Sequence, residues 1–171
     1  MIAMIDIRPA LRDDVPAILG LIRELAEYEK LTHLLAASEA DIDRELFGER
    51  PAAEALVART GGNTVAFALY FHNMSTFLGR RGLWLEDLYV RPDYRRAGIG
   101  EELLRSVARI AAERGCGRFE WTVLDWNQPA IDFYRKLGAD ILPDWRVCRV
   151  TGPALAALAH PSQNGSKPLK T

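Results

Sequence analysis

One continuous stretch, residues 84–115, limits most strongly what this chain can fold into, because it joins a buried strand to a tight turn and an amphipathic helix. The strand is predicted over 83–90, where leucine and aromatic residues are interrupted by Glu86 and Asp87. Pro92 follows and ends the strand, since proline has no N–H for a ladder hydrogen bond. Two carboxylates within an apolar strand cost free energy unless they are paired or used.

The turn after the strand is predicted to bind an anion. Gly98 and Gly100 open a helix with apolar residues at helical spacing, and Gly115 ends it. The first N–H groups of a helix have no helical partner, and the helix dipole favours negative charge there. Because Arg95 and Arg96 stand just before the turn, the predicted anion is a phosphate.

Two common nucleotide-binding loops do not match this turn. A P-loop requires Gly-Lys-Ser/Thr, but Glu101 and Glu102 follow Gly100. A dinucleotide fingerprint requires a third glycine at the position of Leu103. The phosphate therefore belongs to another kind of ligand.

The pattern Arg95-x-x-Gly98-x-Gly100 resembles the pyrophosphate loop of the GNAT family of N-acetyltransferases. Residues 127–139, NQPAIDFYRKLGA, resemble the second cofactor motif of that family. Three further segments are similar to its spermidine/spermine (diamine) and thialysine branch: 21–29, 85–87 and 126–127. The resemblance covers roughly residues 5–150.

The order of predicted elements is strand, two helices, three strands, helix, strand, helix, strand, which is typical of a mixed α/β or α+β sheet. The strands are expected at 5–8, 55–59, 64–71, 83–90, 118–124 and 145–150, with a connecting loop at 72–82. Helices are expected to begin at Asp13 or Asp14, at Ser38 in a capping box, after Gly98, and at Asn127. The resemblance implies a mostly antiparallel sheet that splays between its fourth and fifth strands, with helices on both faces.

The same resemblance implies acetyl-CoA as co-substrate. In the splayed sheet, the backbone of Leu88, Tyr89 and Val90 is expected to pair with the pantetheine arm. The implied diphosphate contacts are Arg95, Arg96, Ala97, Gly98, Ile99, Gly100 and Glu101. The residues of the second motif that are expected to flank the pantetheine arm are Asn127, Gln128, Pro129 and Ala130.

Amide formation requires a proton acceptor, because an alkylamine with a pKa near 10.4 is protonated at neutral pH. Glu86 is the first candidate, on the expectation that burial raises its pKa, and Asp87 is expected to hold the ammonium group. A structural alternative is that both carboxylates form salt bridges with Arg80, Arg81 or Arg118.

By resemblance, Tyr134 is the general acid that protonates the leaving thiolate, and the N–H of Leu88 stabilises the oxyanion. Without the surrounding motif, a tyrosine at this position of an amphipathic helix is more typical of core packing.

The implied substrate contacts are Tyr28, Glu29, Asp87, Glu120, Trp121, Thr122 and, as a stand-in, Asp144. The acidic residues at the end of the first helix, Glu24, Glu27 and Glu29, form either a solvated face or a loop that attracts cations. The loop 140–144 is shorter than in the polyamine enzymes, which disfavours long polyamines. Thialysine, lysine and diamines stay open as substrates.

Composition sets the remaining expectations. A chain of 171 residues with 49% apolar residues can bury one core, so a single domain over 1–160 and a disordered tail over 161–171 are predicted. A net charge of −1 without a basic block disfavours nucleic acid, and no apolar run is long enough to span a membrane. Cys116 and Cys148 are not spaced as metal ligands, and the first ten residues do not resemble a secretion signal, so a metal-free cytoplasmic protein is expected. The resemblance implies a homodimer. A protein-amine acetyltransferase and a non-catalytic CoA-binding module are the alternative functions.

Overall fold

A computed structural model describes residues 5–160, and the predicted tail at 161–171 lies outside the described residues. The chain divides into two compact units, Met1–Thr122 and Val123–Thr171, and each is considered by itself. The single domain over 1–160 stays a prediction.

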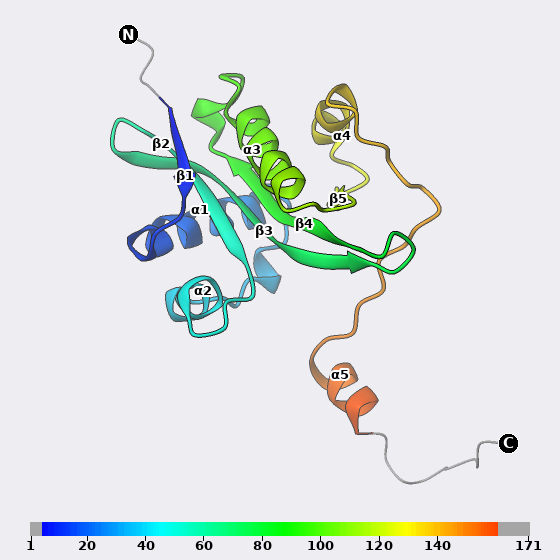
Figure 1. The fold of residues 1–171 in the computed structure, drawn as a ribbon. Helices are drawn as coiled ribbons and strands as arrows, with labels where there is room; N and C mark the ends of the chain where they lie inside the picture. Colours follow the sequence, from blue (N-terminus) through cyan, green and yellow to red (C-terminus); the bar gives the residue numbers. More distant parts are fainter. Residues whose placement is uncertain (1–4, 161–171) are drawn as a thin grey trace, which may run out of the picture. The chain divides into compact units, whose positions relative to one another are not determined.

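The first unit is built on a five-stranded sheet in the order β1-β2-β3-β4-β5 (Figure 1). Its strands are β1 (Asp6–Pro9), β2 (Glu54–Thr60), β3 (Asn63–Ser75), β4 (Arg80–Val90) and β5 (Phe119–Glu120). All neighbours are antiparallel except β4 and β5, which are parallel. The mixed, mostly antiparallel sheet is therefore confirmed.

Helices cover both faces of this sheet, with α3 on one face and α1 and α2 on the other (Figure 1). Their bounds are α1 (Val15–Tyr28), α2 (Glu39–Phe47) and α3 (Ile99–Glu113), with short 3₁₀ turns at Arg12–Asp14, Thr32–Leu34 and Pro92–Tyr94. Ile18, Leu21 and Leu46 from the helices pack with Phe67 and Tyr89 from the sheet. Because Tyr89 belongs to this core, its packing fixes the position of β4 against α1.

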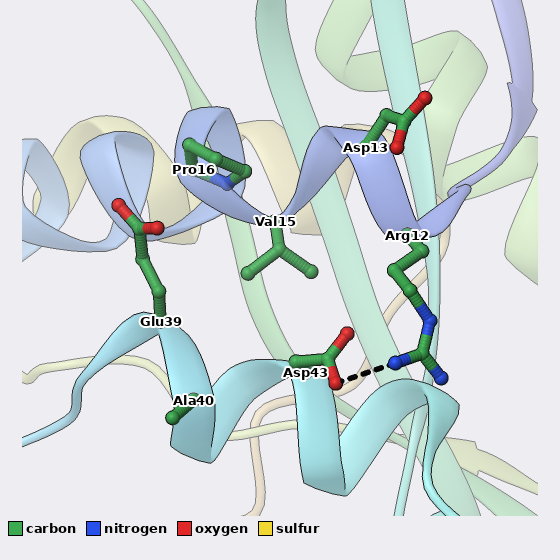
Figure 2. Close-up of a pocket in the computed structure, with 7 residues that line it drawn as sticks. All are labelled: Arg12, Asp13, Val15, Pro16, Glu39, Ala40 and Asp43. Carbon is green, nitrogen blue, oxygen red and sulfur yellow. Dashed lines mark hydrogen bonds and ion pairs between the residues drawn. The ribbon is translucent and has the colours of Figure 1, made fainter.

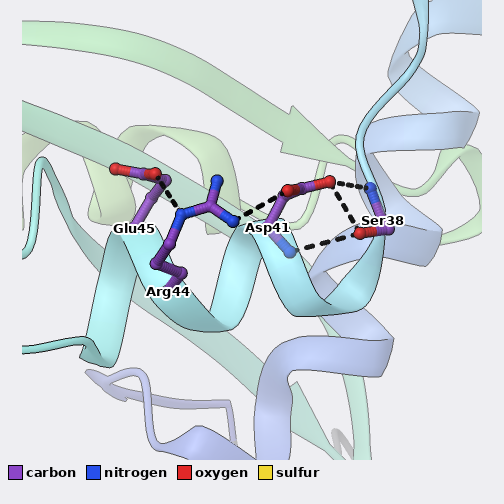
Figure 3. A network of polar contacts seen from close by, with 4 residues as sticks. All are labelled: Ser38, Asp41, Arg44 and Glu45. Atoms are coloured by element: carbon purple, nitrogen blue, oxygen red, sulfur yellow. Dashed lines mark hydrogen bonds and ion pairs between the residues drawn. The ribbon is translucent and has the colours of Figure 1, made fainter.

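Helix α2 begins with the predicted capping box (Figure 3). The Asp41 N–H donates to Ser38 Oγ at 3.2 Å, and the Ser38 N–H donates to Asp41 Oδ2 at 3.0 Å. Asp41 also accepts from Arg44 at 3.0 Å, and Arg44 Nε in turn donates to Glu45 at 2.9 Å. These four residues form a continuous polar chain along the exposed side of α2.

The predicted cap of α1 is right in position but wrong in chemistry. Asp14 precedes the helix, yet its side chain makes no cap hydrogen bond. Its carboxylate instead accepts from Arg8 at 2.7 and 3.1 Å and from the N–H of Leu11 at 2.8 Å. Asp14 therefore ties β1 to the turn before the helix.

Three strand predictions need correction. The segment predicted as a loop at 72–82 is mostly strand, because β3 and β4 continue as a long hairpin. The strand predicted at 118–124 is reduced to Phe119–Glu120. The strand predicted at Trp145–Val150 does not form, and the helix α5 (Gly152–Ala159), which was not predicted, follows it. Each error falls where neighbouring strands rather than local pattern decide the pairing.

The second unit contains α4 (Gln128–Lys136) and α5. Helix α4 begins as predicted at Asn127, whose side chain accepts from the N–H of Ala130. Gly138 follows the helix with a φ of 89°. The predicted start and end of this helix are thus confirmed.

Candidate active site

A bulge in β4 brings its two carboxylates to one face of the sheet. Asp87 pairs with Leu69 and Leu85 pairs with Tyr70, so Glu86 is an extra residue with no opposite partner on β3. In a regular strand, neighbouring side chains point to opposite faces, whereas the extra residue of a bulge breaks this alternation. We therefore place Glu86 and Asp87 together on the face that also carries Tyr89.

The bulge also turns the backbone of β4. Before it, the C=O of Arg81 accepts from the N–H of Gly117 at 2.9 Å and the N–H of Leu83 donates to the C=O of Arg118 at 3.0 Å, just before β5. After it, the N–H of Arg91 bonds to Val65 on the β3 side at 3.0 Å. Because backbone groups alternate between the two sides of a strand, Leu88 and Val90 face away from β3.

Beyond Trp84, that side of β4 has no strand partner among the described residues. The pairing with β5 consists of Leu83 with Phe119 and Trp84 with Glu120, and it ends there. This is the predicted splay between the fourth and fifth strands. It leaves the backbone of Leu88 and the N–H of Val90 without a strand partner, whereas the C=O of Val90 accepts from Arg95 Nε at 2.9 Å. Alternation directs the backbone of Tyr89 toward β3, which corrects the expectation that all three residues are free.

The turn that follows β4 leads directly into α3. Arg96 and Gly98 adopt left-handed conformations, with φ of 66° and 79°. The first helical bond runs from the N–H of Glu102 to the C=O of Gly98 at 3.0 Å, which leaves the N–H groups of residues 99–101 without helical partners. A Cβ atom added to Gly100 would meet only the Val90 side chain, at 3.5 Å. The turn is thus open to a ligand.

The acidic residues in the first turn of α3 are paired with arginines. Glu101 binds Arg105 and Glu102 binds Arg109, each at 2.8 Å. These pairs offset the negative charge that would otherwise oppose an anion at the helix N-terminus.

The electrostatics of the two carboxylates differ. Burial raises the pKa of Asp87 to about 7, and the charges of Glu86 and Glu29 contribute further. Glu86 is exposed and accepts a hydrogen bond from Trp84 Nε1 at 3.0 Å. The expectation that burial acts on Glu86 is therefore wrong, because the bulge leaves this residue at the surface and places Asp87 under the end of α1.

Burial also raises the pKa of Glu29. Its helix neighbour Glu24 forms an ion pair with Arg91 at 2.9 Å, so the acidic end of α1 is only partly a solvated face. Within the described residues, neither Glu86 nor Asp87 forms an ion pair. The salt-bridge alternative is not realised, because Arg118 pairs with Glu120 at 2.7 Å instead.

Arg95 lies between two tyrosines. Its guanidinium carbon is 5.0 Å from the ring centroid of Tyr28 and 5.5 Å from that of Tyr89. Its Nε donates to the C=O of Val90 at 2.9 Å. The first residue of the predicted diphosphate loop is thereby held by the end of α1 and by β4.

These features agree with a family match. The sequence model of the acetyltransferase (GNAT) family matches residues 19–139. This chain belongs to that family.

The relatives of this acetyltransferase include enzymes that acetylate amines. It is 41% identical over 168 residues to the thialysine N-epsilon-acetyltransferase of Sus scrofa, and the match covers 92% of this chain and 98% of the relative. It is 34% identical over 197 residues to the L-ornithine N5-acetyltransferase NATA1 of Arabidopsis thaliana, which covers 89% and 86%. Among solved structures, an integron cassette protein from the mobile metagenome of V. cholerae matches with a TM-score of 0.77 and 27% identity, covering 91% of this chain and 98% of the other. The resemblance to the thialysine branch and the N-acetyltransferase class are confirmed.

In the second unit of the acetyltransferase, Tyr134 is buried in α4, and its ring lies 5.3 Å from that of Phe133. Asn127 is also buried, Gln128 and Pro129 are exposed, and Ala130 is half-buried. Asp144 is exposed, in a segment without regular structure.

A separate hollow of the acetyltransferase lies between the start of α1 and α2 (Figure 2). An ion pair between Arg12 and Asp43, 2.7 Å long, crosses it. None of the predicted site residues lines this hollow.

Two contacts of the acetyltransferase were not predicted from the sequence, the hydrogen bond from Trp84 to Glu86 and the ion pair of Glu24 with Arg91. The i, i+2 spacing of Trp84 and Glu86 would have suggested a shared face for these two residues. Nothing in the local pattern connects Glu24 with Arg91. Among the described residues, no helix is long and apolar enough to cross a membrane.

Proposed function

We propose that this acetyltransferase transfers the acetyl group of acetyl-CoA to the primary amine of a small cationic substrate, such as thialysine, a lysine-like or ornithine-like amino acid, or a diamine. The observation that carries the proposal is Asp87, a half-buried carboxylate with a pKa raised to about 7, beside the open edge of β4. A proton acceptor with this pKa suits catalysis at neutral pH. The substrates named for the relatives support an amine of this size.

The residues of the first unit fit acetyl-CoA. The N–H groups of residues 99–101 would hold its diphosphate, with Arg95, Arg96 and Ala97 forming the approach. The backbone of Leu88 and the N–H of Val90 would pair with the amide groups of the pantetheine arm, in the way that an added strand pairs with a sheet edge. When bound, acetyl-CoA supplies a thioester whose carbonyl carbon an amine can attack.

The carboxylate pair would manage the proton of the amine. We assign proton acceptance to Asp87, because its pKa lies near the working pH, and the orientation of the ammonium group to Glu86. The competing assignment is the one expected from the sequence, in which Glu86 accepts the proton. It predicts that loss of Glu86 is the more damaging change.

Tyr134 would donate a proton to the sulfur of the leaving thiolate, and the N–H of Leu88 would hold the developing negative charge on the carbonyl oxygen. From the second motif, residues 127–130 would flank the pantetheine arm.

Substrate recognition would begin at the end of α1. Tyr28 and Glu29 would contact the cation there, and Asp87 lies near enough for its pKa to respond to Glu29. Glu120, Trp121 and Thr122 would line the far side, with Glu120 held in place by Arg118. Asp144 would add a further negative charge.

Thiol release from acetyl-CoA tests this function directly. The amine panel contains thialysine, ornithine, lysine, putrescine and spermidine. We expect turnover with at least one short amine and a low rate with spermidine. Binding of CoA without turnover of any panel amine would contradict the proposal.

We also propose that the enzyme is a cytoplasmic homodimer, as the resemblance implies. Sedimentation at micromolar concentration is expected to give a mass twice the 19.1 kDa of the chain. A species of 19.1 kDa alone would contradict the dimer.

A further inference from the structure

We infer that Tyr28, which the proposed function assigns to the amine, is also a positioning residue for the CoA diphosphate loop and acts on it through Arg95. The inference rests on the proposed function, because it concerns the affinity of the same loop for CoA. Its basis is the stack in which the Arg95 guanidinium lies 5.0 Å from the Tyr28 ring and 5.5 Å from the Tyr89 ring.

Arg95 is well placed to control the loop. It directly follows the 3₁₀ turn Pro92–Tyr94 and directly precedes Arg96, whose φ of 66° is unfavourable for a residue with a side chain. Gly98, at 79°, completes the turn. A short segment with two left-handed residues can adopt many other backbone conformations once Arg95 is no longer held in place. Holding the first loop residue therefore reduces the conformational entropy that CoA binding has to remove.

One side of the stack is fixed. Tyr89 belongs to the core and interacts with Glu24. Glu24 pairs with Arg91, which is itself bonded through its N–H to Val65 at 3.0 Å and through its guanidinium to Thr64 at 3.3 Å. The position of the Tyr89 ring is thus fixed by the core and by its interaction with Glu24, which is itself bonded to Arg91.

The other side of the stack is the end of a helix. Tyr28 is the last residue of α1 and is exposed, so its ring can be removed without opening the core. Because its ring lies against the Arg95 guanidinium, it helps to keep Arg95 against Tyr89 and on the C=O of Val90. The end of α1 therefore interacts with both predicted binding regions, with the diphosphate loop through the Tyr28 ring and with Asp87 through the charge of Glu29.

The test is CoA binding measured by calorimetry without any amine, since a residue that only contacts the amine would not change this affinity. Tyr28→Leu removes the aromatic ring and keeps a good helix former. Tyr28→Phe is the matched control, because it keeps the ring and its interaction with the cation. We expect CoA to bind two- to fivefold more weakly to Tyr28→Leu, which corresponds to about 0.4–1 kcal/mol, and to bind Tyr28→Phe within about 1.5-fold of the parent.

A double-mutant cycle with Arg95→Met assigns the route. If Tyr28 acts through Arg95, Tyr28→Leu changes CoA affinity by less than about 1.5-fold when Arg95 is already replaced. An unchanged affinity in Tyr28→Leu, an equal loss in Tyr28→Phe, or a full loss in the Arg95→Met background would each overturn the inference. In all three cases the parent protein still binds CoA and turns over, so the proposed function would stand. Absence of CoA binding by the parent would remove both.

Discussion

Glu29, at the end of α1, and Asp87, in the bulged part of β4, interact through their charges, and this interaction helps to raise the pKa of Asp87 to about 7. Burial is the larger cause, and Glu86 contributes as well. The charges of Glu86 and Glu29 thus both act on Asp87, and no cation is among the causes of its pKa shift. Such an arrangement disfavours the ionised form of the Asp87 carboxyl group and favours the binding of a cationic ligand.

The first prediction concerns stability. The pKa of Asp87 is higher in the folded protein than the ordinary 3.8, so the folded state binds more protons between pH 4 and pH 7. Its contribution to the free energy of unfolding is present below about pH 4 and is lost as the pH rises through 7. Asp87→Asn cannot ionise and should gain relative to the parent by about 1–3 kcal/mol between pH 4.5 and pH 8, less than the full shift because the side chain keeps some hydration. Urea unfolding at both pH values measures this, with the exposed Glu86→Gln as control.

The second prediction concerns the pH dependence of activity. If Asp87 accepts the proton, kcat/KM falls about tenfold per pH unit below pH 7, where its carboxyl group is protonated. Asp87→Asn should lose about 10²–10⁴-fold in kcat/KM and should lack this acidic limb, while the titration of the amine itself persists. A larger loss in Glu86→Gln than in Asp87→Asn would instead identify Glu86 as the acceptor.

The third prediction concerns the proton donor. Tyr134→Phe removes one hydroxyl from a buried ring and should lower kcat by about 10²–10⁴-fold, or roughly 3–5 kcal/mol of barrier lowering. CoA affinity and the melting temperature should change little, because the ring and its neighbour Phe133 are kept. Near-parental kcat in this variant would show that Tyr134 serves packing alone.

The fourth prediction concerns the link between β1 and α1. Burial alone would raise the pKa of Asp14, but its hydrogen bonds from Arg8 and Leu11 lower it below 3.8. Asp14→Ala leaves the guanidinium of Arg8 and the Leu11 N–H unpaired and should cost about 2–3 kcal/mol at pH 7. The loss should shrink below pH 3.8, where the native carboxylate becomes protonated.

Asp13→Ala is the matched control for this change, because Asp13 is exposed and precedes the same helix. Its effect should stay within about 0.5 kcal/mol. Equal losses in the two variants would contradict a specific role for the bonds of Asp14.

The sequence predicted the parts of the fold that depend on local chemistry. The Ser38 capping box, the Asn127 cap and the glycine turn at Gly98 each require particular residues at fixed spacing, and all three form as predicted. The hairpin beyond His72 and the short β5 could not be predicted in this way. Their lengths depend on which strand lies alongside, which the periodicity of one segment does not contain.

Of the two carboxylates predicted in the site, the wrong one was expected to be buried. In a regular strand, Glu86 and Asp87 would alternate, and the apolar surroundings suggested burial for Glu86. Only the register against Leu69 and Tyr70 reveals the inserted residue that moves Asp87 under α1. The contact between Arg95 and Tyr28 was equally hidden, because 67 positions along the chain separate these residues.

The bulge also limits how this candidate active site can be transplanted or altered. If Glu86 were deleted, Leu85 and Asp87 would become neighbours in a plain alternating strand, the pairings with Tyr70 and Leu69 would be kept, and Leu88 and Val90 would still face away from β3. One deleted amino acid would thus remove the acid pair and leave the strand edge beside it in place. A designer who moves these chemical groups to another sheet must therefore carry over the irregularity in the strand together with the side chains.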